Sequence, residues 1–151
     1  MRDIKIAGWI LVPLALASVS MVGYVSHAQA QSKFKAQCDQ FVNESIINIC
    51  SDWNSEELLR RAEPDSVQAC DLKAVEKIFN VFSKLGRLKK YYGCEGGIEA
   101  KDDLVTYFYI AVADFEKGRA TLVLQGSWKK GVFYIGDFKV KSEALLKARH
   151  E

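Results

Sequence analysis

Residues 104–140 read LVTYFYIAVADF, EKG, RATLVLQGSW, KKG and VFYIGDFKV in succession, and this stretch decides the fold. The three longer runs are rich in β-branched and aromatic residues, which favour strands. Each of the two short runs ends in glycine and has the length of a hairpin connection. The stretch therefore predicts three antiparallel strands joined by two tight turns.

The first run is apolar at almost every position, which is typical of a central strand covered on both faces. In the last run the apolar phase slips: Phe133 and Ile135 share one face, whereas Phe138 and Val140 share the other. Gly136 lies where the phase changes, so we expect a β-bulge there.

A short, half-polar segment, Leu88–Tyr92, precedes the stretch and predicts one more strand. Three glycines follow it, at positions 93, 96 and 97. Because glycine favours turns and bulges over regular strand, we expect Leu88–Tyr92 to end in a turn or bulge.

Helical periodicity dominates residues 34–85, which precede these strands. A first helix is indicated by apolar residues at helical spacing: Phe34, Cys38, Phe41, Val42, Ile46 and Ile49. Asn54 and Glu57 have capping-box spacing and predict the start of a second helix, which Glu63–Ser66 should end. A third helix carries Leu72, Val75, Phe79, Phe82 and Leu85, and Gly86 is its expected C-terminal cap. Ser142 could cap a final helical turn.

Helices followed by a meander predict an α+β fold, with helices packed on one side of a curved antiparallel sheet. Several short motifs carry a family resemblance: Leu85-Gly86-Arg87-Leu88, Tyr91-Tyr92-Gly93, residues 115–120, Gly126-Ser127-Trp128 and residues 133–142. Across Ser55–Leu145 the chain resembles exported bacterial domains of the cystatin-like, nuclear-transport-factor-two-like fold. The resemblance implies a cone-shaped sheet. It implies no single activity, because this superfamily holds isomerases, dehydratases, transport factors and assembly proteins.

The first thirty residues have the pattern of an export segment. Arg2 and Lys5 precede an apolar run, Ile6–Val25, and Ala28-Gln29-Ala30 has small residues where a signal peptidase cuts. The run is also long enough to cross a bilayer, so an uncleaved anchor is the alternative to a signal peptide. Either way we expect one periplasmic or secreted domain at residues 31–151, facing the periplasm if the anchor is kept.

The charge balance of the chain gives no reason to expect nucleic acid as a partner. The formal net charge of +2 becomes +1 without Arg2, Asp3 and Lys5 of the export segment. Proteins that bind nucleic acid through phosphates concentrate positive charge, and this chain does not.

If the chain is exported, its four cysteines are expected to form disulfides, because the compartment outside the cytosol is oxidising. Cys38 and Cys50 lie on one predicted helix about 18 Å apart, at about 1.5 Å per residue, which is beyond the reach of a bridge. Two connectivities remain, and we favour Cys50–Cys70 with Cys38–Cys94. The spacings do not match a zinc ribbon or a thioredoxin-type centre.

Histidine is absent from the predicted domain core, since His27 lies in the leader and His150 in the tail. Histidine-based triads and metal sites therefore lack their central group, and we expect no metal and no cofactor. Carboxylate and tyrosine chemistry remains, as in isomerases of the resembled fold. The catalytic candidates are Asp114, Tyr107 and Tyr109.

Three functions follow as hypotheses. The first is a non-catalytic periplasmic binding or assembly domain that acts through its sheet face or cone pocket on another envelope protein or on itself. The second is a carrier of a small apolar ligand, or an acid–base enzyme of the isomerase kind, that uses the cone cavity. The third is a membrane-anchored subunit of an inner-membrane complex.

Overall fold

The structure is a computed structural model that describes the backbone of residues 7–148 and the side chains of residues 27–148. The chain divides into two compact units, Met1–Gln37 and Cys38–Glu151. Helix α1, Ala7–Asp52, begins in the first unit and continues into the second. The predicted export segment covers residues 1–30. Residues 1–6 and the side chains of residues 7–26 lie outside the described part, so most of this prediction does too. Among the described residues, none of the helices combines the length and hydropathy that a membrane crossing requires.

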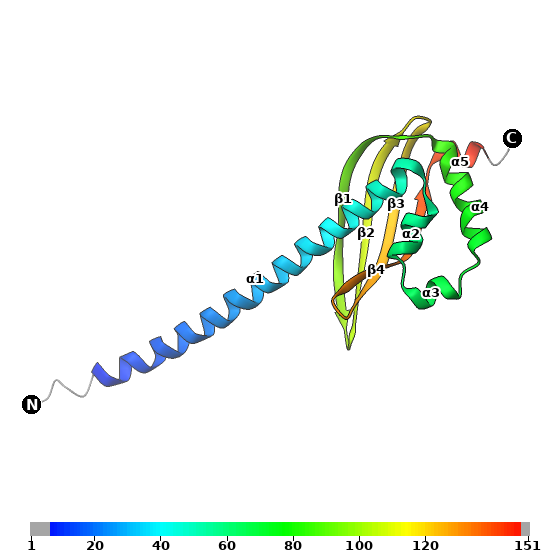
Figure 1. Cartoon of the computed structure of the whole chain (residues 1–151). Helices are drawn as coiled ribbons and strands as arrows, with labels where there is room; N and C mark the ends of the chain where they lie inside the picture. Colours follow the sequence, from blue (N-terminus) through cyan, green and yellow to red (C-terminus); the bar gives the residue numbers. More distant parts are fainter. Residues whose placement is uncertain (1–6, 149–151) are drawn as a thin grey trace, which may run out of the picture. The chain divides into compact units, whose positions relative to one another are not determined.

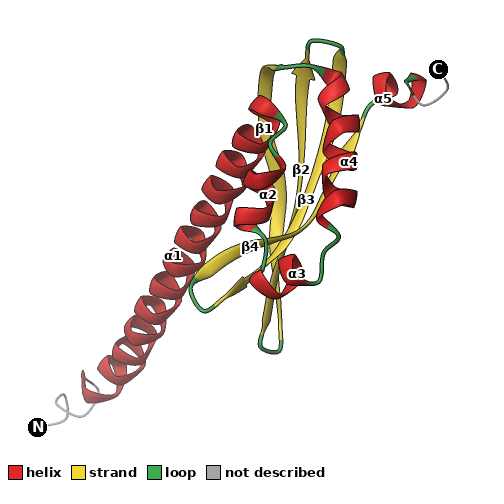
Figure 2. Ribbon diagram, turned by 45° about the vertical axis from the view of Figure 1, so that its right-hand side comes forward, coloured by secondary structure: helices red, strands yellow, loops and turns green. Residues whose placement is uncertain are grey.

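The second unit is built on one antiparallel sheet with the strand order β1-β2-β3-β4. Its strands are β1, Leu88–Lys101; β2, Leu104–Phe115; β3, Gly118–Lys129; and β4, Val132–Lys141. Its shorter helices are α2, Ser55–Arg61; α3, Pro64–Gln68; α4, Leu72–Phe82; and α5, Glu143–Lys147. Helices come first and the meander follows (Figures 1 and 2), so the predicted α+β class is confirmed.

The two hairpins and the bulge in β4 form where the sequence predicts them. The β3–β4 turn uses Lys130 and Gly131 at φ 50° and 83°, the left-handed values that glycine adopts most easily. Gln125 pairs with Asp137 and Gly126 pairs with Ile135, so Gly136 is the extra residue of a bulge. The prediction for Gly136 is therefore confirmed.

The strand β1 differs from its prediction, because it continues to Lys101 instead of ending near Tyr92. Gly93, at φ 88°, lies in a register shift between Tyr91 and Cys94, so a bulge forms there and no turn. The strand then resumes at Cys94 and pairs with β2 from Ala111 to Leu104. The later glycines are not turn residues: Gly96 packs directly on Tyr109 of β2, which leaves no room for a side chain.

The helix ends follow local rules, with three corrections. Asn54 caps α2 by accepting a hydrogen bond from the Glu56 amide at 2.9 Å, but the Glu57 carboxylate contacts Arg60 and Arg61. The second helix ends at Arg61, as the break at residues 63–66 predicts, but Pro64 then begins the short helix α3, because proline suits the first turn of a helix. Ser142 precedes α5, yet its hydroxyl donates to the Arg119 carbonyl at 2.9 Å.

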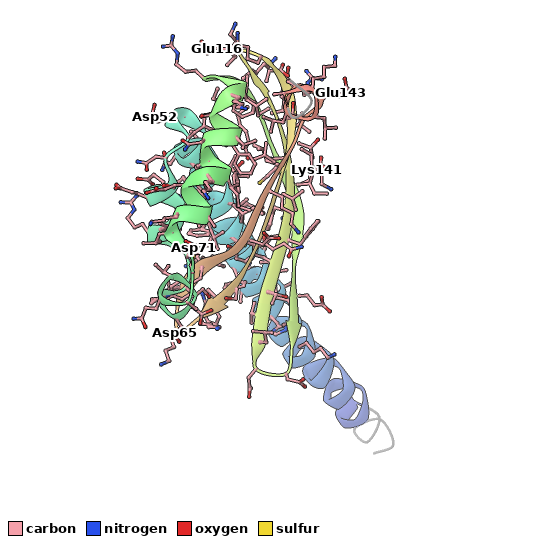
Figure 3. The ribbon with its side chains drawn as sticks, turned by 90° about the vertical axis from the view of Figure 1, so that its right-hand side faces the viewer. Asp52, Asp65, Asp71, Glu116, Lys141 and Glu143 are labelled. Carbon is pink, nitrogen blue, oxygen red and sulfur yellow. The ribbon has the colours of Figure 1, made fainter. Side chains whose placement is uncertain are left out.

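The core lies between the inner face of the sheet and the helices. Its fully buried larger side chains come from α1, the turn before β1, and the strands: Val42, Ile46, Ile49, Leu85, Tyr109, Leu122, Leu124 and Ile135. The helix α4 ends at Phe82, earlier than predicted, and Gly86 instead caps the 3-10 turn Ser83–Leu85 that follows it, at φ 77° and ψ −163°. In Figure 3 the helices α2 and α4 lie on one side of the sheet. Within residues 38–148 the helices α1, α2 and α4 thus pack against the inner face, and the opposite face of the sheet is called the outer face.

Candidate functional site

The outer face of β2 carries large apolar side chains that are open to solvent. Phe108 and Ile110 are 43% and 42% exposed, whereas their neighbours Tyr107 and Tyr109 are 3% and 0% exposed. Successive side chains of a strand point to opposite faces, so β2 buries one half of its apolar residues and presents the other half. The prediction that this strand is covered on both faces is therefore wrong for the described unit, because α1, α2 and α4 pack on one side and leave Phe108 and Ile110 open on the other.

Several residues on three adjacent strands form one outer apolar patch. The patch consists of Tyr92, Phe108, Ile110, Val112 and Val123. Register brings it together, since Ile110 pairs with Val123 across β2 and β3. An open depression of about 1430 Å³ lies over most of it, floored in part by Gly97 of β1. Exposed apolar groups gathered in one place, rather than scattered singly, mark interaction surfaces on soluble domains.

A charged cluster borders the patch at one end. The Asp114 carboxylate accepts hydrogen bonds from Arg119 Nε at 2.7 Å and Arg119 Nη2 at 3.1 Å, and from the Tyr92 hydroxyl at 2.7 Å. Lys90 Nζ and Arg119 Cζ lie 4.7 Å and 5.1 Å from the centre of the Tyr92 ring. These contacts hold the exposed Tyr92 side chain in place through ion pairing and cation–π attraction.

The same cluster argues against Asp114 as a general base. Hydrogen bonds from Arg119 and then from Tyr92 lower the pKa of the Asp114 carboxyl to about 2. An efficient general base has a pKa near the pH at which it works. Asp114 is instead a permanently ionised partner of Arg119, which is a structural role at the rim of the patch.

Tyr107 and Tyr109, the other two catalytic candidates, lie on the inner face. The Tyr107 hydroxyl donates to the Tyr134 carbonyl at 2.7 Å, and the Tyr109 hydroxyl donates to Asp39 Oδ1 at 2.5 Å. Burial raises the pKa of both phenols above its usual range. Both hydroxyls are protonated and donate hydrogen bonds inside the core, so the structure does not bring them together with Asp114. Strand parity could have shown this, because Asp114 is an odd number of residues from each.

We expect the pH dependence of stability to reveal the low pKa of Asp114. The fold lowers the pKa of the Asp114 carboxyl from its ordinary value of 3.8 to about 2, so its contribution to stability is nearly full above about pH 4 and is lost as the pH falls toward 2. The melting temperatures of the wild type and Asp114→Asn should thus differ by a constant amount near neutrality and converge at acid pH. Carbon NMR of the carboxyl group checks the pKa directly. A measured value of 3.8 or higher would contradict the pairing with Arg119.

The four cysteines form no disulfide in this structure. Cys38 and Cys50 are fully buried on α1, whereas Cys70 and Cys94 are half-buried. Burial raises the pKa of the Cys50 thiol to about 12, so Cys50 is a poor nucleophile. The pairing Cys50–Cys70 with Cys38–Cys94 remains a prediction for the oxidised protein.

Two hollows lie on the helix side of the sheet in the described unit. An apolar hollow of about 210 Å³ lies between α2, α3, α4 and β4, lined by side chains that include Leu58, Val67, Phe79 and Phe138. Ligand pockets are usually about 300–1,000 Å³. A second hollow of about 360 Å³ lies between α1, α2 and β4, lined in part by Phe41, Arg61 and Phe133, and it reaches the lower end of that range. Elsewhere the inner face is packed core, where Tyr107 and Tyr109 meet edge to face at 6.1 Å. The larger depression is the one over the outer apolar patch.

The sequence suggested binding through a sheet face, but it did not identify the residues of the outer patch. A signal was present, because residues 104–115 are apolar on both alternating faces of the strand, but that pattern also fits a strand buried on both sides.

Among the described residues, no three histidine, cysteine or acidic side chains are grouped so that they could hold a metal ion. The outer face is suited to binding, because its apolar side chains can be covered by a partner and charged side chains border them.

Searches of protein-family models, curated proteins and solved structures find no match to this chain.

Proposed function

We propose that this protein is an exported, non-catalytic binding domain that docks another protein molecule on the outer face of its sheet. The observation that carries the proposal is the exposure of Phe108 and Ile110, at 43% and 42%, in the middle of the central strand β2. Exposed apolar surface is costly in water, and covering it contributes about 25 cal/mol per Å². A partner that covers the patch would gain that free energy.

The edges of the sheet are less suited to docking than its face. The edge strand β1 carries Lys89, Lys90, Glu95 and Glu99 and is interrupted by two register shifts. Charges and bulges on an edge strand discourage the addition of another strand. The opposite edge strand, β4, is bridged by Ala62 at Ile135. These features support a partner that lies against the outer face.

The finer fold and the location belong to the same proposal. The four-stranded meander with helices on one side supports a cystatin-like domain of the nuclear-transport-factor-two-like kind. The sequence of residues 1–30 supports delivery to the periplasm. The helix α1 is continuous from Ala7 to Asp52. If the apolar run is retained as an anchor, this helix would link the anchor to the domain. The role of the outer face is the same in both cases.

Site-specific photocrosslinking in the native cell tests the proposal. A photoreactive amino acid at Ile110 should form crosslinks to protein, and these should disappear when Phe108→Asp is added. The matched control is Leu146 on α5, which is 61% exposed but does not belong to the outer apolar patch. The same photoreactive residue at position 146 should give no Phe108-dependent product. If positions 108, 110 and 123 all fail to crosslink to protein in a normally folded chain, the docking proposal is wrong.

A further inference from the structure

One row of residues crosses the outer face from edge to edge. The register pairs Glu95 of β1 with Ile110 of β2, Ile110 with Val123 of β3, and Val123 with Lys139 of β4. The row therefore has an acidic group at one end, two apolar groups in the middle and a basic group at the other end. Glu95 and Lys139 are both exposed, and Ile110 is 42% exposed.

This row is complementary to itself under a two-fold rotation. If two sheets pack face to face about an axis parallel to their strands, β1 of one copy lies over β4 of the other. Glu95 then faces its partner's Lys139, Ile110 faces its partner's Val123, and each contact occurs twice. Contacts of this isologous kind define the interface of a closed dimer.

We infer that the molecule docked on the outer face is a second copy of this chain, packed face to face about that axis. The inference rests on the proposed function and specifies its partner. Lys139 Nζ already lies 2.8 Å from Asp137 Oδ2, so in the dimer it bridges Asp137 and the partner's Glu95.

The next row of the face is compatible with this arrangement. It contains Gly97, Phe108, Gln125 and Asp137 in register. The two-fold axis places Asp137 over its partner's Gly97, which has no side chain, so no like charges meet. Phe108 lies over its partner's Gln125, whose methylene groups can cover the ring. Pairing along the β1 edge fits less well, because it brings the acidic Glu95 and Glu99 of the two copies together.

The size of the face is sufficient for a weak but specific dimer. Four strands about 4.8 Å apart and about ten residues long, at about 3.3 Å each, give a face of about 600 Å² per copy. The total of about 1,200 Å² is at the lower end of standard protein interfaces. Because area does not fix affinity, we expect association in the micromolar range, weakened by salt through the Glu95–Lys139 pairs.

Charge exchange tests the inference on the full chain, kept in mild detergent so that residues 1–37 are retained. The self-association of purified variants is measured by sedimentation velocity. Glu95→Lys and Lys139→Glu each turn two attractive contacts into two repulsive ones, and each should weaken self-association about tenfold or more. An equimolar mixture of the two variants should recover a heterodimer, and the double variant should recover the homodimer. Glu76→Lys and Lys77→Glu on α4 are the control reversals and should leave self-association unchanged.

The outcomes separate this inference from the proposed function. A wild-type chain that stays monomeric, or a mixture that does not recover association, overturns the second-copy arrangement. In that case crosslinks from Ile110 to a different protein would still support docking on the outer face. If crosslinking from Ile110 also fails, the proposed function is lost as well.

Discussion

Replacing Trp53 by alanine is expected to lower the free energy of unfolding by about 3–5 kcal/mol, the usual range for truncating a buried aromatic side chain. Trp53 is 8% exposed, and its ring centre lies 5.0 Å from that of Phe115 and 5.8 Å from that of Phe82. Its indole Nε1 donates to the Gly86 carbonyl at 2.8 Å. The side chain thus joins the end of α1 to β2 and to the turn before β1. Urea unfolding followed by far-ultraviolet circular dichroism measures the change.

Two further substitutions at the same position separate the causes. Trp53→Phe keeps most of the ring contacts but leaves the Gly86 carbonyl without its donor, so it should cost about 1–2 kcal/mol. Trp53 also has a φ of 49°, directly after the last residue of α1, a position where glycine is the usual residue. Trp53→Gly should therefore be more stable than Trp53→Ala by about 1 kcal/mol, the reverse of the usual order. An alanine variant that is the more stable of the two would contradict the left-handed backbone.

Substituting Gly96 by alanine should destabilise the fold by about 3 kcal/mol or more, near the upper end of overpacking effects. A Cβ atom at Gly96 would lie 2.6 Å from Tyr109 Cγ and 2.7 Å from Tyr109 Cα, and would also overlap the Phe108 carbonyl oxygen. Backbone atoms of β2 cannot rotate away as a side chain can. The strands β1 and β2 must therefore separate locally, which weakens their hydrogen bonds.

Gly97 provides a matched control on the same strand. A Cβ atom there would have no atom within 4 Å, and its φ lies outside the left-handed region. Gly97→Ala should thus be neutral or should stabilise the fold by up to about 1 kcal/mol through the lower entropy of the unfolded chain. Both variants are compared by urea unfolding at the same protein concentration. Equal effects of the two substitutions would contradict the register of β1 on β2.

Features that depend on neighbouring residues could be predicted from the sequence. The hairpin turns need residues that tolerate a positive φ, and the triplets ending at Gly118 and Gly131 provide them. The slip of the apolar phase at Gly136 predicted the bulge, since a one-residue change of parity requires an extra residue. The cap at Gly86 followed from the end of an apolar helical pattern. Each of these signals lies within a few residues of the structure it predicts.

Features that depend on distant contacts could not be predicted in this way. The glycines at 93, 96 and 97 indicated a turn or bulge, and a bulge forms at Gly93, but Gly96 serves the close approach of Tyr109, thirteen positions along the chain. The candidates Asp114, Tyr107 and Tyr109 looked like one set, but strand alternation puts them on opposite faces of β2. Whether an apolar strand face is buried depends on which elements pack against it, and no local pattern contains that information.

The sequence by itself determined that residues 38–148 form helices and then an antiparallel meander, because periodicity, caps and turn residues are local properties of the chain. Only the tertiary structure decided that the helices gather on one face and leave Phe108, Ile110 and their neighbours open on the other. It also decided the register that sets Glu95 and Lys139 at the two ends of one row. Packing and register depend on contacts between segments far apart in the chain, and these contacts are fixed only when the whole core is assembled.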